Sequence, residues 1–155
     1  MRRFLLLFSS VLLASSAWAV PPADFSGTWT LNPNKSSNLG MMSSMQYEST
    51  ITQSADTLTV RDKSTMMGKT QNQETRYALN GTEIPNTSYM GDPARTVTHW
   101  DGRKLVTVWT SEGAVAGTTK QRTETRSLSD DGGTMLVEST SSGRPPIVFA
   151  FERKK

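Results

Sequence analysis

A long series of short segments, each alternating between apolar and polar residues, is the feature that most constrains the fold of this chain. Such alternation has the period of a half-buried β-strand. The many threonines suit strands because their side chains branch at Cβ, and Gly, Asn, Asp and Pro between the segments favour turns. The pattern predicts an all-β protein, an antiparallel up-and-down β-barrel of about eight to ten strands. We expect strands at 26–32, 47–53, 57–63, 71–79, 83–89, 95–100, 104–111, 118–128, 134–141 and 147–153.

The clearest expected hairpin lies around Asp101-Gly102, a pair that favours tight turns because it tolerates positive φ. A two-residue turn at this pair would place Trp100 opposite Arg103 and Thr98 opposite Leu105. Both faces of the two strands are half apolar. The sequence therefore leaves open which of these faces points into the barrel.

The segment 33–46 differs from the rest of the chain because Ser, Gly and Asn are frequent in it and alternation is absent. Met41, Met42 and Met45 punctuate it. At about fourteen residues it is long enough for one short helix or an irregular flap, and too short for a helix pair. We expect it to form a mobile flap.

The first residues have the pattern of a secretory signal peptide. Arg2 and Arg3 precede a short apolar stretch, 4–14, and Ala17-Trp18-Ala19 supplies small residues for cleavage. We therefore expect a signal peptide at 1–19, cleaved near Ala19, and one β-barrel domain at 20–155. No later apolar stretch reaches spanning length. The expected location is the bacterial periplasm or the medium.

Charge and cysteine content narrow the function classes. The chain has 17 basic and 14 acidic residues, a net charge of +3. Cleavage of the leader removes Arg2 and Arg3, which leaves 15 minus 14, or +1. No basic stripe is interleaved with aromatic residues, so nucleic-acid binding is not expected. The chain has no Cys, which is unusual for a small exported eukaryotic domain and favours a bacterial source.

The residues that enzymes use are scarce. His99 is the single histidine and lies inside an expected strand. The candidate carboxylates, such as Asp92 and Asp130, lie in turns, where Asp is common for backbone reasons. Zinc sites need more His or Cys. Methionines near loops suit copper(I), but their spacing does not repeat, and apolar padding is the simpler interpretation. We expect no enzyme activity, cofactor or metal.

The opening Phe25-Ser26-Gly27-Thr28-Trp29 resembles the Gly-x-Trp start of the calycins, which include lipocalins, fatty-acid-binding proteins and avidins. The segments 100–102, 135–138 and 151–153 look like the C-terminal half of a fatty-acid-binding protein. The opening is also similar to exported bacterial lipocalin-like proteins of unassigned role. The resemblance implies that Trp29 packs under Arg153 and closes one end of the barrel, a structural role.

The resemblance also has a departure that bears on the ligand. Fatty-acid-binding proteins hold a carboxylate with an Arg-x-Tyr pair on the last strand, where this chain has Phe149 and Phe151. The barrel therefore carries over and fatty-acid capture does not, because burying an unpaired anion is costly. Arg126 lies near another position where that family places an interior Arg. The alternating charges of 120–126 favour an Arg126 that faces solvent instead.

These observations favour a non-enzymatic barrel that binds a small apolar or amphipathic molecule. Phe149 and Phe151, on the inward face of the last strand, and one of Trp100 and Trp109 are the expected lining, with Arg126 as a further candidate. The alternative is a barrel filled by its own side chains, which would engage a protein partner in the cell envelope.

Overall fold

Ten antiparallel strands form one curled sheet in the computed structural model, which describes residues 21–155. The order across the sheet is β4-β3-β2-β1-β10-β9-β8-β7-β6-β5, so the first strand pairs with the last. The prediction of an up-and-down β-barrel is confirmed, and the expected signal peptide lies outside the described residues. The strands are β1 (Gly27–Leu31), β2 (Gln46–Gln53), β3 (Thr57–Met66), β4 (Lys69–Ala78), β5 (Ile84–Thr87), β6 (Pro93–Asp101), β7 (Lys104–Glu112), β8 (Thr119–Leu128), β9 (Thr134–Ser141) and β10 (Ile147–Arg153).

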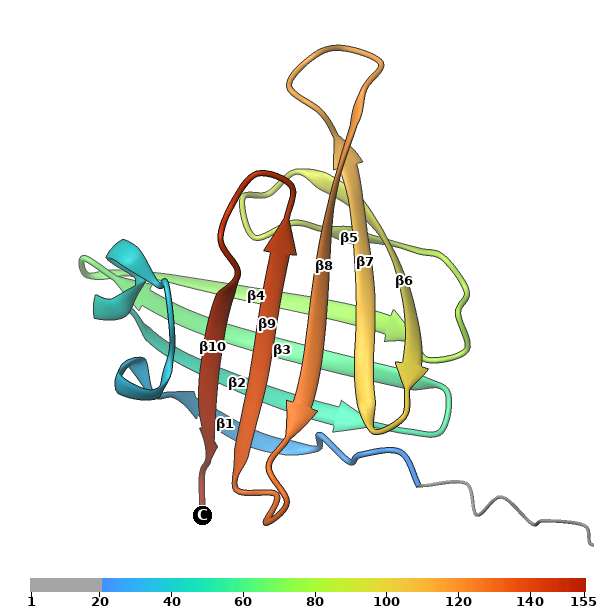
Figure 1. The fold of residues 1–155 in the computed structure, drawn as a ribbon. Helices are drawn as coiled ribbons and strands as arrows, with labels where there is room; N and C mark the ends of the chain where they lie inside the picture. Colours follow the sequence, from blue (N-terminus) through green and yellow to red (C-terminus); the bar gives the residue numbers. More distant parts are fainter. Residues whose placement is uncertain (1–20) are drawn as a thin grey trace, which may run out of the picture.

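The barrel is nearly closed, and β4 and β5 are the two edges of the sheet within the described residues. Figure 1 shows β1 to β4 running at a steep angle to β6 to β10. Side chains join the two edges. Asn86 accepts a hydrogen bond from the backbone N of Arg76 (3.3 Å) and donates one to its carbonyl oxygen (2.7 Å). Gln73 donates to the carbonyl of Thr87 (2.7 Å). Asn86 thus mimics one rung of a β-ladder, which the edges otherwise lack.

The β6–β7 hairpin turns one residue later than the sequence suggested. Asp101 pairs with Lys104, and Trp100 pairs with Leu105, so Arg103 is not the partner of Trp100. The turn residues are Gly102 and Arg103, and Gly102 has φ +58°. Glycine at the first position of a two-residue turn is the type II′ arrangement, which matches strand twist. Relative to the expected register, each residue of β6 pairs with a residue two positions further along β7. A shift of two keeps every side chain on the same face, so the composition of each face is unchanged.

That hairpin presents a polar but buried face to the barrel interior. Thr96, Thr98, Leu105, Thr107 and Trp109 are buried. The opposite face points outward, and the histidine on it is exposed. The structure therefore decides the question that the sequence left open, in favour of the face that carries the threonines and Trp109.

The segment between β1 and β2 holds two short 3₁₀ helices, η1 (Pro33–Lys35) and η2 (Gly40–Ser44). The expectation that this segment holds at most one short helix is therefore wrong. Pro at the first position and the capping side chain of Asn32 favour η1. Buried Leu39 and Met45 flank η2 and fix both of its ends to the barrel. No helix in residues 21–155 is long and apolar enough to cross a membrane.

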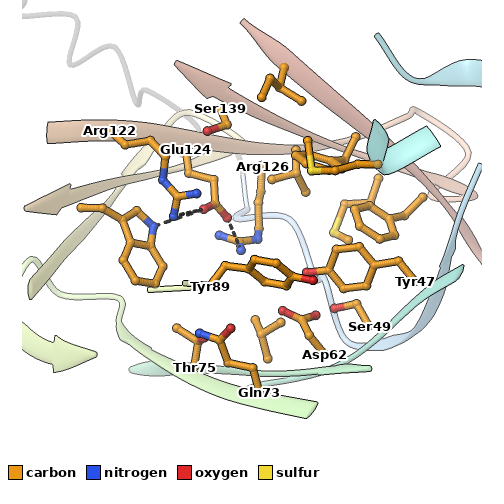
Figure 2. Close-up of a pocket in the computed structure, with 18 of the residues that line it drawn as sticks. Tyr47, Ser49, Asp62, Gln73, Thr75, Tyr89, Arg122, Glu124, Arg126 and Ser139 are labelled. Atoms are coloured by element: carbon orange, nitrogen blue, oxygen red, sulfur yellow. Dashed lines mark hydrogen bonds and ion pairs between the residues drawn. The ribbon is translucent and has the colours of Figure 1, made fainter. Parts of the chain in front are cut away.

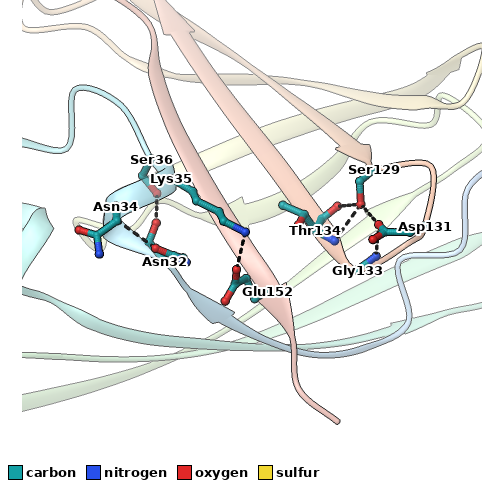
Figure 3. Close-up of polar contacts among 9 residues, drawn as sticks. All are labelled: Asn32, Asn34, Lys35, Ser36, Ser129, Asp131, Gly133, Thr134 and Glu152. Atoms are coloured by element: carbon teal, nitrogen blue, oxygen red, sulfur yellow. Dashed lines mark hydrogen bonds and ion pairs between the residues drawn. The ribbon is translucent and has the colours of Figure 1, made fainter.

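Side chains order the turn between β8 and β9 (Figure 3). Ser129 donates to a carboxylate oxygen of Asp131 (2.6 Å), and the backbone N of Gly133 donates to the same oxygen (2.9 Å). These two hydrogen bonds lower the pKa of Asp131. This turn also positions Arg153, whose Nε donates to the carbonyl of Gly132 (3.0 Å). A loop of small and polar residues thus positions the last cation of the barrel.

Trp29 and Arg153 close one end of the barrel. They are paired in register across β1 and β10, and the Arg153 guanidinium carbon lies 4.2 Å from the indole centroid. Trp29 is fully buried, and its Nε1 donates to the carbonyl of Phe25 (2.9 Å). The stacking that the resemblance implied is present, and we call this region the closed end.

A candidate ligand cavity

A cavity of about 340 Å³ lies inside the barrel, away from the closed end. Volumes of this order suit a small organic ligand. All strands but β1, β5 and β6 contribute to it, together with η2 and the loops at its mouth. Its lining consists of Met42, Met45, Tyr47, Ser49, Ile51, Val60, Asp62, Gln73, Thr75, Tyr77, Tyr89, Met90, Trp109, Arg122, Glu124, Arg126, Met135, Val137, Ser139, Ser141, Arg144, Pro145, Ile147, Phe149 and Phe151.

One wall of the cavity is apolar and comes mainly from β9 and β10. Phe149 and Phe151 stack with their ring centroids 6.4 Å apart. Tyr47 meets Phe151 edge to face at 5.3 Å. Met135 and Val137 extend this wall from the neighbouring strand. Such a surface supplies affinity by removing apolar ligand area from water.

A buried ion pair from β8 forms the polar part of the cavity. Glu124 and Arg126 are 7% and 5% exposed, and their side chains form an ion pair. The expectation that Arg126 faces solvent is wrong. Arg126 and Glu124 lie opposite buried Leu105 and Thr107 on β7, so both point inward despite their charges.

Aromatic side chains enclose this ion pair. Tyr77 accepts a hydrogen bond from Nη2 of Arg126 (3.3 Å), and the guanidinium lies over its ring at 4.9 Å. Trp109 Nε1 donates to Oε2 of Glu124 (3.1 Å). Arg122 lies over the Trp109 ring at 4.9 Å and 3.5 Å from the same carboxylate. Burial opposes ionisation of Tyr77, and it raises the pKa of this phenol.

The opposite wall carries a second carboxyl group. Figure 2 shows Asp62 and Ser49 across the cavity from Glu124 and Arg126. Asp62 and Ser49 are direct neighbours on β3 and β2. Burial raises the pKa of Asp62, although the hydroxyls of Ser49 and Tyr47 oppose that rise. Burial also raises the pKa of Tyr47 well above its usual range.

Methionines surround the mouth of the cavity. Met42 and Met45 reach it from the η2 segment, and Met90 from the turn between β5 and β6. Tyr89 of that turn donates to the sulfur of Met45 (3.7 Å) and is 3.0 Å from the hydroxyl of Ser64. The two loops are thus in contact over the mouth. Flexible thioethers in this position provide adaptable apolar padding.

The structure separates the residues that the sequence singled out. Phe149, Phe151, Trp109 and Arg126 all line the cavity. Trp100 does not. It lies toward the closed end and stacks on Phe25, with centroids 6.1 Å apart, because its position near the β6–β7 turn is far along the barrel from the mouth.

Sequence reasoning missed several polar residues of the site, notably Asp62, Tyr77 and Glu124. The available signal was the alternation of faces along each strand. On β8 the charged residues share one face with Leu128. On β4 Thr75 and Tyr77 have the same alternation as Leu79, which directly follows the strand. His99 lies on the outer face of β6 and is exposed. Among residues 21–155, no group of three or more His, Cys, Asp or Glu side chains could hold a metal ion.

Known proteins resemble this chain in structure and not detectably in sequence. No protein-family model matches it, and no curated protein does so by sequence. Human cRBP IV superimposes with a TM-score of 0.65 at 21% identity, over 86% of this chain and 100% of its own. The fluorescent protein UnaG superimposes with a TM-score of 0.67 at 22% identity, over 84% of this chain and 97% of its own. Caenorhabditis elegans lipid binding protein 8 superimposes with a TM-score of 0.64 at 14% identity, over 84% of this chain and 95% of its own.

These comparisons define the class of fold. The chain shares the β-barrel fold of these three proteins. At such identities the likeness concerns the fold alone. The expected closeness to exported bacterial lipocalin-like proteins stays a prediction.

Proposed function

We propose that this protein is a non-enzymatic carrier or sensor that binds one small amphipathic molecule inside the barrel. The observation that carries the proposal is the cavity of about 340 Å³, with an apolar aromatic wall on one side and a buried polar cluster on the other. Such a combination of apolar surface and few convergent polar groups is typical of ligand sites. It weighs against the alternative in which side chains fill the barrel.

The structural neighbours support the proposal at the level of class. One is described as a lipid binding protein and another as a fatty acid transporter. Both have the barrel fold of this chain. The η2 segment between Leu39 and Met45 lies at the mouth. We infer that it moves to admit the ligand.

The direct test is native mass spectrometry of the protein purified from its own host under non-denaturing conditions. We expect a co-purified molecule of a few hundred daltons that is lost on denaturation. A thermal-shift panel of lipids and aromatic compounds should raise Tm for the ligand class, because a ligand that binds only the folded state stabilises it. Absence of any adduct together with absence of any thermal shift would contradict the proposal.

A variant identifies the cavity as the place of binding. Phe149→Asp puts a charge on the apolar wall and should abolish the shift given by an active compound. The control is Leu136→Asp on the neighbouring strand, where the side chain is 40% exposed. Equal loss in both variants would place the binding elsewhere.

A further inference from the structure

Arg126 has one nitrogen that finds no hydrogen-bond partner among residues 21–155. Its Nη1 is buried and makes no hydrogen bond within residues 21–155. Its Nη2 contacts both Glu124 and Tyr77. The side chain is almost fully buried and lines the cavity. A buried donor without a partner is unfavourable, so a ligand acceptor that reached Nη1 would relieve this cost.

The charge of Arg126 is already neutralised. Glu124 forms an ion pair with it and is itself buried. The second oxygen of this carboxylate is held by Trp109 and lies 3.5 Å from Arg122. A ligand carboxylate that approached Nη1 would stand beside the carboxylate of Glu124. Like charges at short range in a weakly polar interior repel strongly.

In the deep part of the cavity, the charges of the described residues balance when Asp62 is ionised. Asp62 faces Arg126 and Glu124 from the opposite wall, and its charge interacts with both. With Asp62 ionised, two cations and two anions cancel; the cations are Arg122 and Arg126. Arg144, the remaining cation of the lining, lies exposed at the mouth.

We propose, on the basis of the function proposed above, that the cavity selects an uncharged ligand. Its polar end carries a hydrogen-bond acceptor, such as the carbonyl of an amide or the oxygen of an alcohol, which binds Arg126 Nη1. The same chain ending in a carboxylate binds more weakly. Glu124 is the specificity-determining residue, because it already pairs with the positive charge of Arg126 that a ligand carboxylate would need.

The test compares two compounds of equal shape, decanamide and decanoate, at pH 7.5. Each displaces Nile red, an uncharged dye, from the wild-type protein. We expect decanamide to bind at least about tenfold more tightly than decanoate, which corresponds to a difference of about 1.4 kcal/mol in binding free energy. Equal or tighter binding of decanoate overturns the inference and leaves the proposed function standing. If the dye binds and neither compound displaces it, the inference is likewise overturned and the proposed function stands. Failure of the dye and both compounds to bind overturns both proposals.

A variant pair tests the role of Glu124. Glu124→Gln removes the like charge and should raise the affinity for decanoate about tenfold or more relative to decanamide. Glu138→Gln, an exposed glutamate on β9, should leave the ratio unchanged. Circular dichroism shows whether Glu124→Gln folds. If it does not, Asp62→Asn on the opposite wall should shift the ratio in the same direction. An unchanged ratio in a folded cavity variant overturns the inference.

Discussion

At the scale of single residues, the closed end explains why glycine occupies position 27. Gly27 has φ +132°, where residues with a side chain are strained. A Cβ at this position would lie 2.7 Å from Nη1 of Arg153. The small residue therefore lets the guanidinium cross over the strand and cover Trp29. The Gly-x-Trp motif and the terminal cation form one structural unit.

Gly27→Ala should therefore destabilise the fold through both strain and displacement of Arg153. We expect a loss of about 2–4 kcal/mol in the free energy of unfolding, from backbone strain and the weakened cation–π contact. Urea unfolding measures it. Gly81→Ala is the matched control, since Gly81 also has positive φ (+84°) but nothing lies near its missing Cβ. Equal losses in the two variants would show that the contact with Arg153 contributes nothing.

Asp62 gives the cavity a pH-dependent cost. Its folded-state pKa is raised by burial above the ordinary value of 3.8. Between these two pKa values the folded state binds more protons than the unfolded state, so stability falls as pH rises through that window. Above the folded-state pKa of Asp62, the ionised carboxyl destabilises the fold by its full amount.

Asp62→Asn should remove this cost. We expect the variant to have a higher Tm than the wild type at pH 7.5, with a difference that shrinks as pH falls toward 4. Thermal unfolding across this range measures the difference. Asp130→Asn, in an exposed turn, should show no such trend. A wild type more stable than Asp62→Asn at pH 7.5 would mean that the ionised carboxyl stabilises the fold.

At the scale of secondary-structure elements, the seam between β4 and β5 is the weak line of the barrel. Other neighbouring strands pair through backbone ladders, whereas side chains of Asn86 and Gln73 join these two edges. Pro85 lies within β5, which suits an edge strand because Pro has no N–H to donate. Local opening is expected where few backbone hydrogen bonds resist it.

Asn86→Ala should open this seam without unfolding the barrel. Loss of the hydrogen bonds to Arg76 and to Thr96 (2.8 Å) should cost about 1–3 kcal/mol. Hydrogen exchange should accelerate in β5 and in the β4 residues near Arg76, while β8 and β9 keep their protection. Asn72→Ala, on an exposed position of β4, serves as the control. Unchanged exchange in β5 would show that Asn86 does not hold the edges together.

The elements also show how far the sequence could predict this molecule. Alternation located ten strands because most of them bury one face, and the face of β10 that carries Phe149 and Phe151 is evident from its aromatic residues. The orientation of β8 was not evident, since charged residues normally point outward and only the pairing with β7 turns Glu124 and Arg126 inward. Asp62 shares its face of β3 with buried Leu58 and Val60, but its place beside the ion pair was not evident, because its neighbours across the cavity come from a distant strand.

At the scale of the whole molecule, the two ends of the barrel differ in construction. The closed end is covered by Trp29, Arg153 and the β8–β9 turn. The other end holds the cavity and loops rich in methionine. Buried Ala23 and Phe25 belong to the fold.

We infer that the protein is exported and that its working form lacks the leader. Expression of the full chain in a bacterial host followed by cell fractionation should yield a protein in the periplasm or medium whose intact mass corresponds to cleavage near Ala19. The physical reason is the charged start and short apolar stretch of 1–19. Retention of the full-length mass in the cytoplasm would contradict this inference.

Trp109 gives the molecule an intrinsic optical signal for occupancy. Of the tryptophans in residues 21–155, Trp29 lies beneath the terminal arginine and Trp100 is stacked on Phe25, both remote from the cavity. Trp109 alone of the three borders the space that a guest would fill, in contact with a cation and a carboxylate. A guest that alters those contacts changes the emission of one indole against two steady ones, so binding becomes visible without any attached dye.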